Sequence, residues 1–340
     1  MSRKSTAQDV ADLAGVSRSA VSLVLNGRAS GAISAAKQKA VLDAARRLEY
    51  SPNMVAKSLR TSRTHILGVL TWRGLAGLPL PLLASTLETS LHAGYQLLKM
   101  YAEPTELDQR RALGTLTSRL VDGILVISPE LCEYHAVEAL SAVPVVLLNC
   151  VDPSRLLSSV APDEEAAGAR AGELLIERGH RSVGLLRGSL SHHQTGQRAY
   201  GLQRVLLAAG LPPAVPQVSE VRIDAGIAAA TALLTAADPP TALVCTNERL
   251  AVGAFFAAAA LGLRVPEDLS VVSLDDREQL AGQLSPAVTL VSRPDDQMAA
   301  QAAELLIERL ESGTDPATQH YSFVCPVVEG GSVAAPAVVR

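Results

Sequence analysis

The first residues that could do chemistry lie close to the N-terminus, on what their spacing predicts to be one short helix. In the run 14–26, Gly15 is a turn residue and Ser17 is a good helix N-cap. The apolar positions that follow recur on one side of the helix. The other side is formed by Arg18, Ser19 and Ser22. A guanidinium and two hydroxyls on one exposed face suit hydrogen bonding to phosphates and base edges.

A second set of polar residues is spread over the rest of the chain. Asn149, Asn247 and Asp275 each follow an apolar run directly or within two residues, and Arg198 lies early in a predicted helix. A carboxylate accepts hydrogen bonds from paired hydroxyls, an amide both donates and accepts, and arginine presents a rigid fork of donors. Together these groups can satisfy the hydrogen bonds of a polyol without catalysing a reaction.

The N-terminal polar face is positioned by helices on either side of it. Thr6 stands three residues before Asp9, which is the spacing of a capping box. The apolar face that follows consists of Val10, Leu13 and Ala14. A third helix is predicted to begin after its N-cap Ser34 and to end before Pro52. This arrangement is a helix-turn-helix.

The charge of the chain is divided unevenly along its length. Residues 1–65 carry eleven Lys or Arg against four Asp or Glu, a net charge of +7, and with the whole chain at −4 the remaining 275 residues stand at −11. A basic segment attached to an acidic body is expected when only that segment meets a polyanion. The N-terminal segment is therefore predicted to bind nucleic acid.

From Ile66 onward, apolar strands alternate with helices. The predicted strands are 66–70, 96–101, 124–127, 145–149, 182–186, 216–221, 242–245, 270–274 and 320–328. The predicted helices are 79–93, 105–120, 131–141, 164–178, 194–209, 224–236, 248–261 and 295–311. This alternation predicts an α/β fold of two lobes with doubly wound parallel sheets. Ligands bind such sheets at the carboxyl ends of the strands, so a cleft is expected between the lobes.

Composition limits the class of protein. A length of 340 residues with 48% hydrophobic and 19% charged residues is typical of an ordered chain with two or three domains. The four cysteines are widely spaced and predicted to be buried thiols, and the N-terminus has no apolar signal segment. We therefore expect a cytoplasmic protein that does not span a membrane. His192 and His193 have no further ligand at metal-binding spacing, and neither a metal nor a cofactor is predicted.

Residues 6–59 resemble the DNA-binding headpiece of the LacI-type (lactose and galactose repressor) family. The matching sequence segments are Asp9-Val10-Ala11, Ala14-Gly15-Val16-Ser17, Val21-Ser22, Val24-Leu25-Asn26-Gly27, Tyr50-Ser51-Pro52-Asn53, Val55-Ala56 and Ser58-Leu59. In that family, residues 53–60 would be a hinge helix that orders on DNA and places Leu59 in the minor groove, with Val55 and Ala56 packing on the partner hinge. A segment this short needs a partner to be stably helical.

The resemblance implies which residues contact DNA. Arg18 and Ser19 would read base edges, and Thr6, Ser22 and Asn26 would touch phosphates. The full DNA-binding set expected is Thr6, Ser17, Arg18, Ser19, Ser22, Asn26, Val55, Ala56 and Leu59. The chain departs from the family pattern at Leu23, where an arginine is common, so its operator is expected to differ.

The remainder resembles the periplasmic-binding-protein-like effector domain of the same family. The similarity runs through Arg178-Gly179-His180-Arg181, Arg198 with Gly201, Asn247-Glu248, Ser270-Val271-Val272 and Asp275-Asp276. By that match Arg198, Asn247 and Asp275 would bind an effector, together with Asn149. The segment 76–81 lacks the aromatic residue that sugar-binding members often carry there, and Glu248 replaces the usual aspartate.

We therefore expect a homodimeric repressor of carbohydrate-utilisation genes that binds a palindromic double-stranded DNA operator and is controlled by a sugar in the interlobe cleft. The alternatives are a nucleobase or other non-sugar effector, and action as a corepressed or activating factor. A solute-binding protein would need a signal sequence, and an enzyme would need catalytic motifs that the sequence lacks. The expected domains are a headpiece at 1–52, a hinge helix and linker at 53–64, an effector-binding and dimerisation domain at 65–330 and a tail at 331–340.

Overall fold

The structure is a computed structural model of the full chain. It describes residues 5–25, 27, 29–50, 58, 63–72, 80–103, 105–135, 143–190, 192–276, 279–312 and 317–337. The chain divides into two compact units, residues 1–64 and residues 65–340. Four residues predicted to contact DNA, Asn26, Val55, Ala56 and Leu59, lie outside the described ranges, as does most of the predicted hinge helix.

The N-terminal unit contains the three predicted helices. They are α1 (Ala7–Ala14), α2 (Arg18–Leu25) and α3 (Ala35–Arg47). The capping box is present, because the amide of Asp9 donates to the Thr6 hydroxyl at 3.3 Å and the amide of Thr6 donates to the Asp9 carboxylate at 2.7 Å. Gly15 ends α1 in the left-handed conformation, with φ at +64°, which turns the chain sharply toward α2.

One predicted core residue of this unit is exposed. Val10, Ala11, Val21 and Val41 are buried together, but Leu13 is 44% exposed. Successive helical residues are turned by about 100°. Because α1 buries Val10 and Ala11, Leu13 falls to the side of the apolar stripe. Placing Leu13 on the buried face was therefore wrong.

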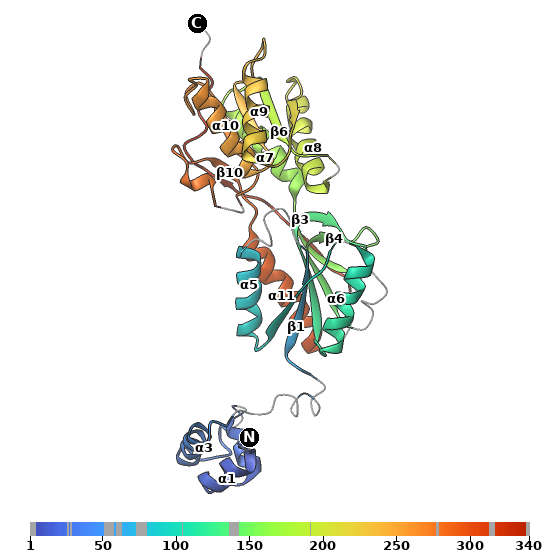
Figure 1. Ribbon diagram of the computed structural model, residues 1–340, viewed down its shortest axis with the longest axis vertical. Helices are drawn as coiled ribbons and strands as arrows, with labels where there is room; N and C mark the ends of the chain where they lie inside the picture. Colours follow the sequence, from blue (N-terminus) through green and yellow to red (C-terminus); the bar gives the residue numbers. More distant parts are fainter. Residues whose placement is uncertain are drawn as a thin grey trace. The chain divides into compact units, whose positions relative to one another are not determined.

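Residues 65–340 form two lobes, each built on a sheet with helices on both faces (Figure 1). In lobe 1 the strand order is β11-β5-β4-β3-β1-β2, and every described pair is parallel. The strands are β1 (Ile66–Thr71), β2 (Gln96–Tyr101), β3 (Gly123–Glu133), β4 (Val145–Val151), β5 (Ser158–Pro162) and β11 (His320–Phe323). The helices are α5 (Leu80–His92), α6 (Glu106–Ser118) and α11 (Asp295–Ser312).

Lobe 2 repeats this plan with the strand order β12-β10-β9-β8-β6-β7, in which only the described pair β10 and β12 is antiparallel. The strands are β6 (Val183–Arg187), β7 (Val215–Val218), β8 (Ala242–Cys245), β9 (Ser270–Ser273), β10 (Thr289–Val291) and β12 (Val327–Val328). The helices are α7 (Glu164–Glu177), α8 (His193–Ala208), α9 (Ile223–Leu234) and α10 (Glu248–Ala260), with a 3-10 turn at Ala281–Gln283. The predicted fold class is confirmed.

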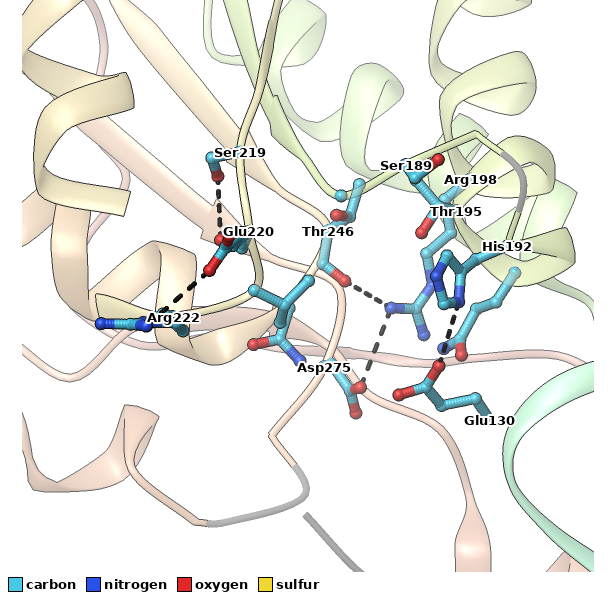
Figure 2. Close-up of a pocket in the computed structure, with 14 residues that line it drawn as sticks. Glu130, Ser189, His192, Thr195, Arg198, Ser219, Glu220, Arg222, Thr246 and Asp275 are labelled. Atoms are coloured by element: carbon cyan, nitrogen blue, oxygen red, sulfur yellow. Dashed lines mark hydrogen bonds and ion pairs between the residues drawn. The ribbon is translucent and has the colours of Figure 1, made fainter. Parts of the chain in front are cut away.

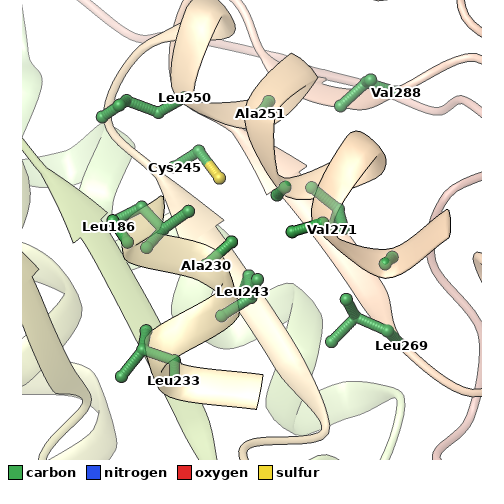
Figure 3. Close-up of a cluster of buried hydrophobic side chains, with 14 of the residues drawn as sticks. Leu186, Ala230, Leu233, Leu243, Cys245, Leu250, Ala251, Leu269, Val271 and Val288 are labelled. Atoms are coloured by element: carbon green, nitrogen blue, oxygen red, sulfur yellow. The ribbon is translucent and has the colours of Figure 1, made fainter. Parts of the chain in front are cut away.

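Apolar strand residues on both faces of each sheet explain the layers. In lobe 1, α5 and α11 cover one face and α6 covers the other. In lobe 2, α9 and α10 cover one face, and α7 and α8 cover the other. Figure 3 shows Leu186, Leu243 and Val271 of three neighbouring strands in one cluster with Leu233 of α9 and Leu250 of α10. Each fully buried leucine stabilises the fold by about 1.5–3 kcal/mol.

The chain passes between the lobes three times. The first passage runs from β5 to α7 through Asp163, the second from β10 to α11 through Arg293, and the third from β11 to β12 through Cys325. Lobe 1 therefore takes α11 and β11 from the C-terminal part of the chain. These connections resemble hinges, because only short segments join two separately packed sheets.

Three sequence predictions for this unit differ from the structure. The helix predicted at 131–141 is wrong at its start, because Leu131 and Cys132 continue β3, and its residues 136–141 lie outside the described ranges. The strands β5 and β10 were not predicted. The strand predicted at 320–328 is two strands, one in each sheet. Among the described helices, none is long and apolar enough to cross a membrane.

Candidate functional site

The exposed face of α2 carries the residues predicted to meet DNA. Arg18, Ser19 and Ser22 are exposed, whereas Val21 and Val24 pack inward. The Ser17 hydroxyl accepts a hydrogen bond from the amide of Ala20 at 3.2 Å, so it caps the helix as predicted.

Among the residues predicted to contact DNA, Ser19 and Thr6 have hydroxyl groups with hydrogen-bond partners within the headpiece. Ser19 lies 2.9 Å from the Ser17 hydroxyl. The Thr6 hydroxyl donates to the Asp9 carboxylate at 2.7 Å. A phosphate contact from Thr6 would have to share this capping hydrogen bond.

A pocket of about 350 Å³ lies at the carboxyl ends of the lobe 2 strands (Figure 2). Its walls come from the segments that follow β6, β7, β8 and β9, and from Glu130 of lobe 1. Glu130 lies 3.6 Å from Nδ1 of His192. Three of the four residues predicted to bind an effector line this pocket: Arg198, Asn247 and Asp275.

Arg198 is buried and held mainly by the protein itself. Its Nε lies 2.5 Å from Oε2 of Glu164, and its Nη2 lies 2.9 Å from Oε1 of the same carboxylate. Its Nη1 donates to the carbonyl oxygen of Thr246 at 2.6 Å and lies 3.9 Å from Oδ2 of Asp275 (Figure 2). Burial works against the charge, but Glu164 and Asp275 outweigh it, so the pKa of Arg198 lies above its ordinary value.

Backbone contact between two helices brings Arg198 to Glu164. Gly168 of α7 faces the carbonyl oxygen of Arg198, which would lie 2.0 Å from a Cβ at that position. Gly201 of α8 similarly faces the carbonyl oxygen of Glu165, at 1.9 Å from a Cβ. Only glycine allows this close approach of the two backbones. Gly168 and Gly201 therefore determine where α7 and α8 cross, and this crossing brings Arg198 within hydrogen-bonding distance of Glu164.

Asn247 and Asp275 also have structural roles. The Asn247 side chain accepts a hydrogen bond from the amide of Arg249 at 2.8 Å and so caps α10. Oδ1 of Asp275 accepts from the amide of Asp276 at 3.1 Å. Both residues still line the pocket, where Asn247 and Asp275 are 7% and 3% exposed.

Asn149 lies elsewhere. It sits near the end of β4 in lobe 1, is fully buried and has φ at +57°. Its amide donates to the carbonyl oxygen of Ser128 at 2.9 Å. Its Oδ1 has no hydrogen-bond partner in the described part of the chain. Asn149 is not among the residues that line the pocket with Arg198.

Several polar residues that line the pocket were not predicted from the sequence, and one of them, Gln194, has a side-chain amide that is unsatisfied among the described residues. Gln194 is 5% exposed, and its Nε2 has no hydrogen-bond partner in the described part of the chain. A buried amide without a partner costs about 1–3 kcal/mol. Because this amide lines the pocket, a bound acceptor would remove that cost. Its position at the start of α8, four residues before Arg198, was the available signal.

The pocket combines acidic, basic and neutral polar side chains. Its carboxylates are Glu130, Glu220 and Asp275, and its cationic groups are Arg198 and Arg222, with His192 beside them. Arg222 lies 3.8 Å from Glu220 (Figure 2). Within the described residues, no group of three His, Cys, Asp or Glu side chains could hold a metal ion. The arrangement offers donors and acceptors to a small neutral polar molecule.

Known proteins match both units. Residues 6–53 match the family described as "Bacterial regulatory proteins, lacI family", and residues 172–333 match the "Periplasmic binding protein-like domain". The HTH-type transcriptional repressor PurR of Edwardsiella ictaluri (strain 93-146) is 30% identical over 317 residues and covers 92% of each chain. The protein of the same name from Yersinia pestis (strain Pestoides F) is 31% identical over 320 residues, which are 92% of this chain and 93% of its own.

Solved structures match as well. The lac repressor dimer bound to operator and the anti-inducer ONPF has a TM-score of 0.81 at 25% identity, covering 98% of this chain and 100% of that one. The complex of the transcriptional regulator CelR with cellobiose has a TM-score of 0.67 at 26% identity, covering 96% and 99%. Both matches extend over the headpiece and the two lobes.

Proposed function

Because the chain belongs to the LacI family of bacterial transcriptional regulators, we propose that it is a homodimeric, operator-binding repressor whose DNA affinity is set by a nucleobase bound in the lobe 2 pocket. The DNA-binding and repressor character follows from the family. The residue roles and the identity of the effector are the proposed part.

The headpiece supports the DNA-binding role in detail. Arg18 lies on an exposed face next to Ser19, while the opposite face of α2 is buried. The net charge of +7 over residues 1–65 supplies the phosphate attraction that dominates DNA affinity. One headpiece contacts a half-site, so two copies related by a twofold axis would bind a palindrome. The cytoplasmic location expected from the sequence remains a prediction.

The effector proposal rests chiefly on the Nε2 amide of Gln194. This buried donor lines the pocket, and Asp275 contributes a carboxylate. A nucleobase combines carbonyl and ring-nitrogen acceptors with N–H donors on one flat edge, so it can engage an amide and a carboxylate together. Arg198 already gives three of its five donors to Glu164 and Thr246, which leaves less of its fork for a polyol.

The relatives support the same choice. The name PurR points to purines and not to sugars, so the nucleobase alternative fits these relatives better than the expected carbohydrate. A sugar is the second candidate, because the CelR neighbour is a complex with cellobiose. The two candidates differ in the groups they present, since a sugar offers hydroxyls and a nucleobase offers a planar acceptor edge.

Calorimetric titration distinguishes them. Hypoxanthine, guanine, glucose and cellobiose are titrated separately into the full-length protein, with and without operator DNA. We expect a purine base to bind and its affinity to change in the presence of operator, because coupling between two sites is reciprocal. The direction of that change separates an inducer from a corepressor. Binding of only the sugars would overturn the nucleobase assignment.

A further inference from the structure

The two cysteines of lobe 1 face each other across neighbouring strands. In the register of β3 and β4, Cys132 is paired with Cys150. Both side chains belong to the same cluster on the α6 face of the sheet, where Cys150 is fully buried and Cys132 is half-buried. Cys132 is therefore the more exposed residue of the pair, and Cys150 lies beside it on the neighbouring strand.

We propose that Cys132 and Cys150 form a redox-modification site, in which a hydroperoxide oxidises Cys132 and Cys150 then closes a reversible disulfide between β3 and β4. The chemistry balances. The Cys132 sulfur attacks a peroxide oxygen and becomes a sulfenic acid, the O–O bond breaks, and the rest of the peroxide leaves as water, or as an alcohol when the hydroperoxide is organic. The Cys150 sulfur displaces that hydroxyl, so the S–S bond forms, the S–O bond breaks and water leaves.

The spacing of the strands permits this bond. Neighbouring strands lie about 4.8 Å apart, and the Cα atoms of a disulfide lie about 4.4–6.8 Å apart. The Cβ atoms must approach to about 3.5–4.5 Å, so residues directly opposite on parallel strands must shift slightly. The register of β3 shifts between Ile127 and Cys132, so the regular pairing with β4 is already interrupted next to Cys132. A disulfide formed against such a shift is readily reduced, as a reversible site requires.

The two thiols differ in reactivity in the required direction. A hydrogen bond from the neighbouring thiol lowers the pKa of Cys132. Burial raises the pKa of Cys150. The accessible sulfur is therefore the better nucleophile, since the thiolate is the reactive form. Cys245 in lobe 2 is fully buried, and burial alone raises its pKa.

The site connects to the pocket through a short chain of hydrogen bonds. The Cys132 thiol lies 3.4 Å from the Ser128 hydroxyl, which in turn bonds to the carbonyl oxygen of Glu130. Among the described residues that line the pocket, Glu130 alone comes from lobe 1. A shift of β3 on oxidation would therefore move Glu130 relative to His192. This consequence rests on the proposed effector site, whereas the disulfide itself does not.

The disulfide is tested without effector or DNA. Reduced full-length protein is treated with hydrogen peroxide, alkylated and digested without reductant. We expect two of the four thiols to be lost and one peptide pair to be joined through Cys132 and Cys150, with recovery in dithiothreitol. Cys132→Ser and Cys150→Ala should each abolish the joined peptide, and the matched control Cys245→Ala should retain it. Sulfinate at Cys132 without a joined peptide, a bond between two chains, or unreacted thiols would each overturn the proposal.

A second measurement tests the connection to the pocket. Purine titration is repeated on the oxidised protein and on peroxide-treated Cys132→Ser. We expect oxidation to lower the purine affinity of the wild type roughly tenfold, which corresponds to the loss of one hydrogen bond to a charged group. The affinity of Cys132→Ser should not change on peroxide treatment. Equal purine affinities of the oxidised and the reduced wild type would contradict the proposed connection between the cysteine pair and the pocket. Absence of purine binding in either state would refute the nucleobase and not the disulfide, because the joined peptide is read independently.

Discussion

Arg198 and Glu164 form a buried ion pair with two contacts, Nε to Oε2 at 2.5 Å and Nη2 to Oε1 at 2.9 Å. Glu164 begins α7 directly after its N-cap Asp163, in the first passage between the lobes, and Arg198 lies in α8. The residue predicted to bind the effector is thus first a part of the framework of lobe 2. Its substitution would change folding and binding together.

The pair predicts a large loss of stability in Glu164→Ala. Removing the carboxylate leaves the Arg198 charge buried without its main partner, which typically costs about 3–5 kcal/mol. Urea denaturation measures this loss. The control is Glu165→Ala, whose partner Arg204 lies 3.1 Å away at the surface and whose removal should cost about 0–1 kcal/mol. Similar losses in the two variants would contradict the buried pair.

Gln194→Ala should weaken effector binding and leave stability almost unchanged. Its Nε2 has no hydrogen-bond partner in the described part of the chain, so its removal relieves a cost of about 1–3 kcal/mol, which offsets the packing lost with the side chain. A bound acceptor would lose one hydrogen bond, about 0.5–1.5 kcal/mol of affinity. Gln203→Ala in the same helix is the matched control, since Gln203 bonds both the amide and the carbonyl of Ala214. It should lower stability and spare affinity; the reverse pattern would rule out the role of Gln194.

In the headpiece, Arg18→Ala should relax base preference at one position of each half-site and cost about 1–3 kcal/mol there. Asn26→Ala, as a phosphate-contact variant, should weaken all sequences alike. Electrophoretic mobility shifts on operators varied one base pair at a time separate the two effects. Wild-type affinity should fall on the order of 10³-fold between 50 and 200 mM salt. Uniform loss for both variants would contradict the division between base and phosphate contacts.

Two glycine substitutions should have opposite effects on stability, because Gly201 lies at the contact between α7 and α8 whereas Gly114 has open space around it. Gly201→Ala would place a methyl group 1.9 Å from the carbonyl oxygen of Glu165, so the helices must separate, at about 1–3 kcal/mol or more. Gly114→Ala lies within α6 with nothing within 4 Å and should stabilise by about 0.5–1 kcal/mol. Thermal unfolding of both variants measures the difference. A stabilised Gly201→Ala would mean that the helices do not need this contact.

Local signals account for the parts of the fold that were predicted. The strand Ala242–Cys245, which is buried, and the strand Gln96–Tyr101, at the edge of its sheet, were predicted with their observed ends, because turn residues bound both apolar runs. The capping box at Thr6 and the turn at Gly15 were equally local. By contrast, β3 continues past a register shift between Ile127 and Cys132 and ends at Glu133. The apolar residues from 131 onward have the spacing of a helix, so the end of this strand was predicted as helical.

Long-range relations account for what was missed. Glu164 and Arg198 are separated by 34 residues and meet only because α7 and α8 touch at Gly168 and Gly201. No periodicity within either helix indicates that approach. Asn149 failed to join the pocket for the same kind of reason, since its position after a strand is local, whereas the direction of its amide depends on Ser128 of the neighbouring strand.

The three passages between the lobes also set an order of events during synthesis. The core of lobe 1 contains Met298 and Leu306 of α11, packed on Leu67 and Leu125 from much earlier in the chain. On the ribosome, the first five strands of that sheet therefore emerge with one face covered by α5 but not yet by α11, and α11 follows only after most of lobe 2 has been translated. Lobe 2 has its large helical layers before then, so it can form first, although it begins later in the gene. A nascent chain stopped before residue 295 should leave part of an apolar sheet face of lobe 1 exposed and depend on chaperones, whereas a chain that includes α11 should cover that face, with β11 and β12 added last.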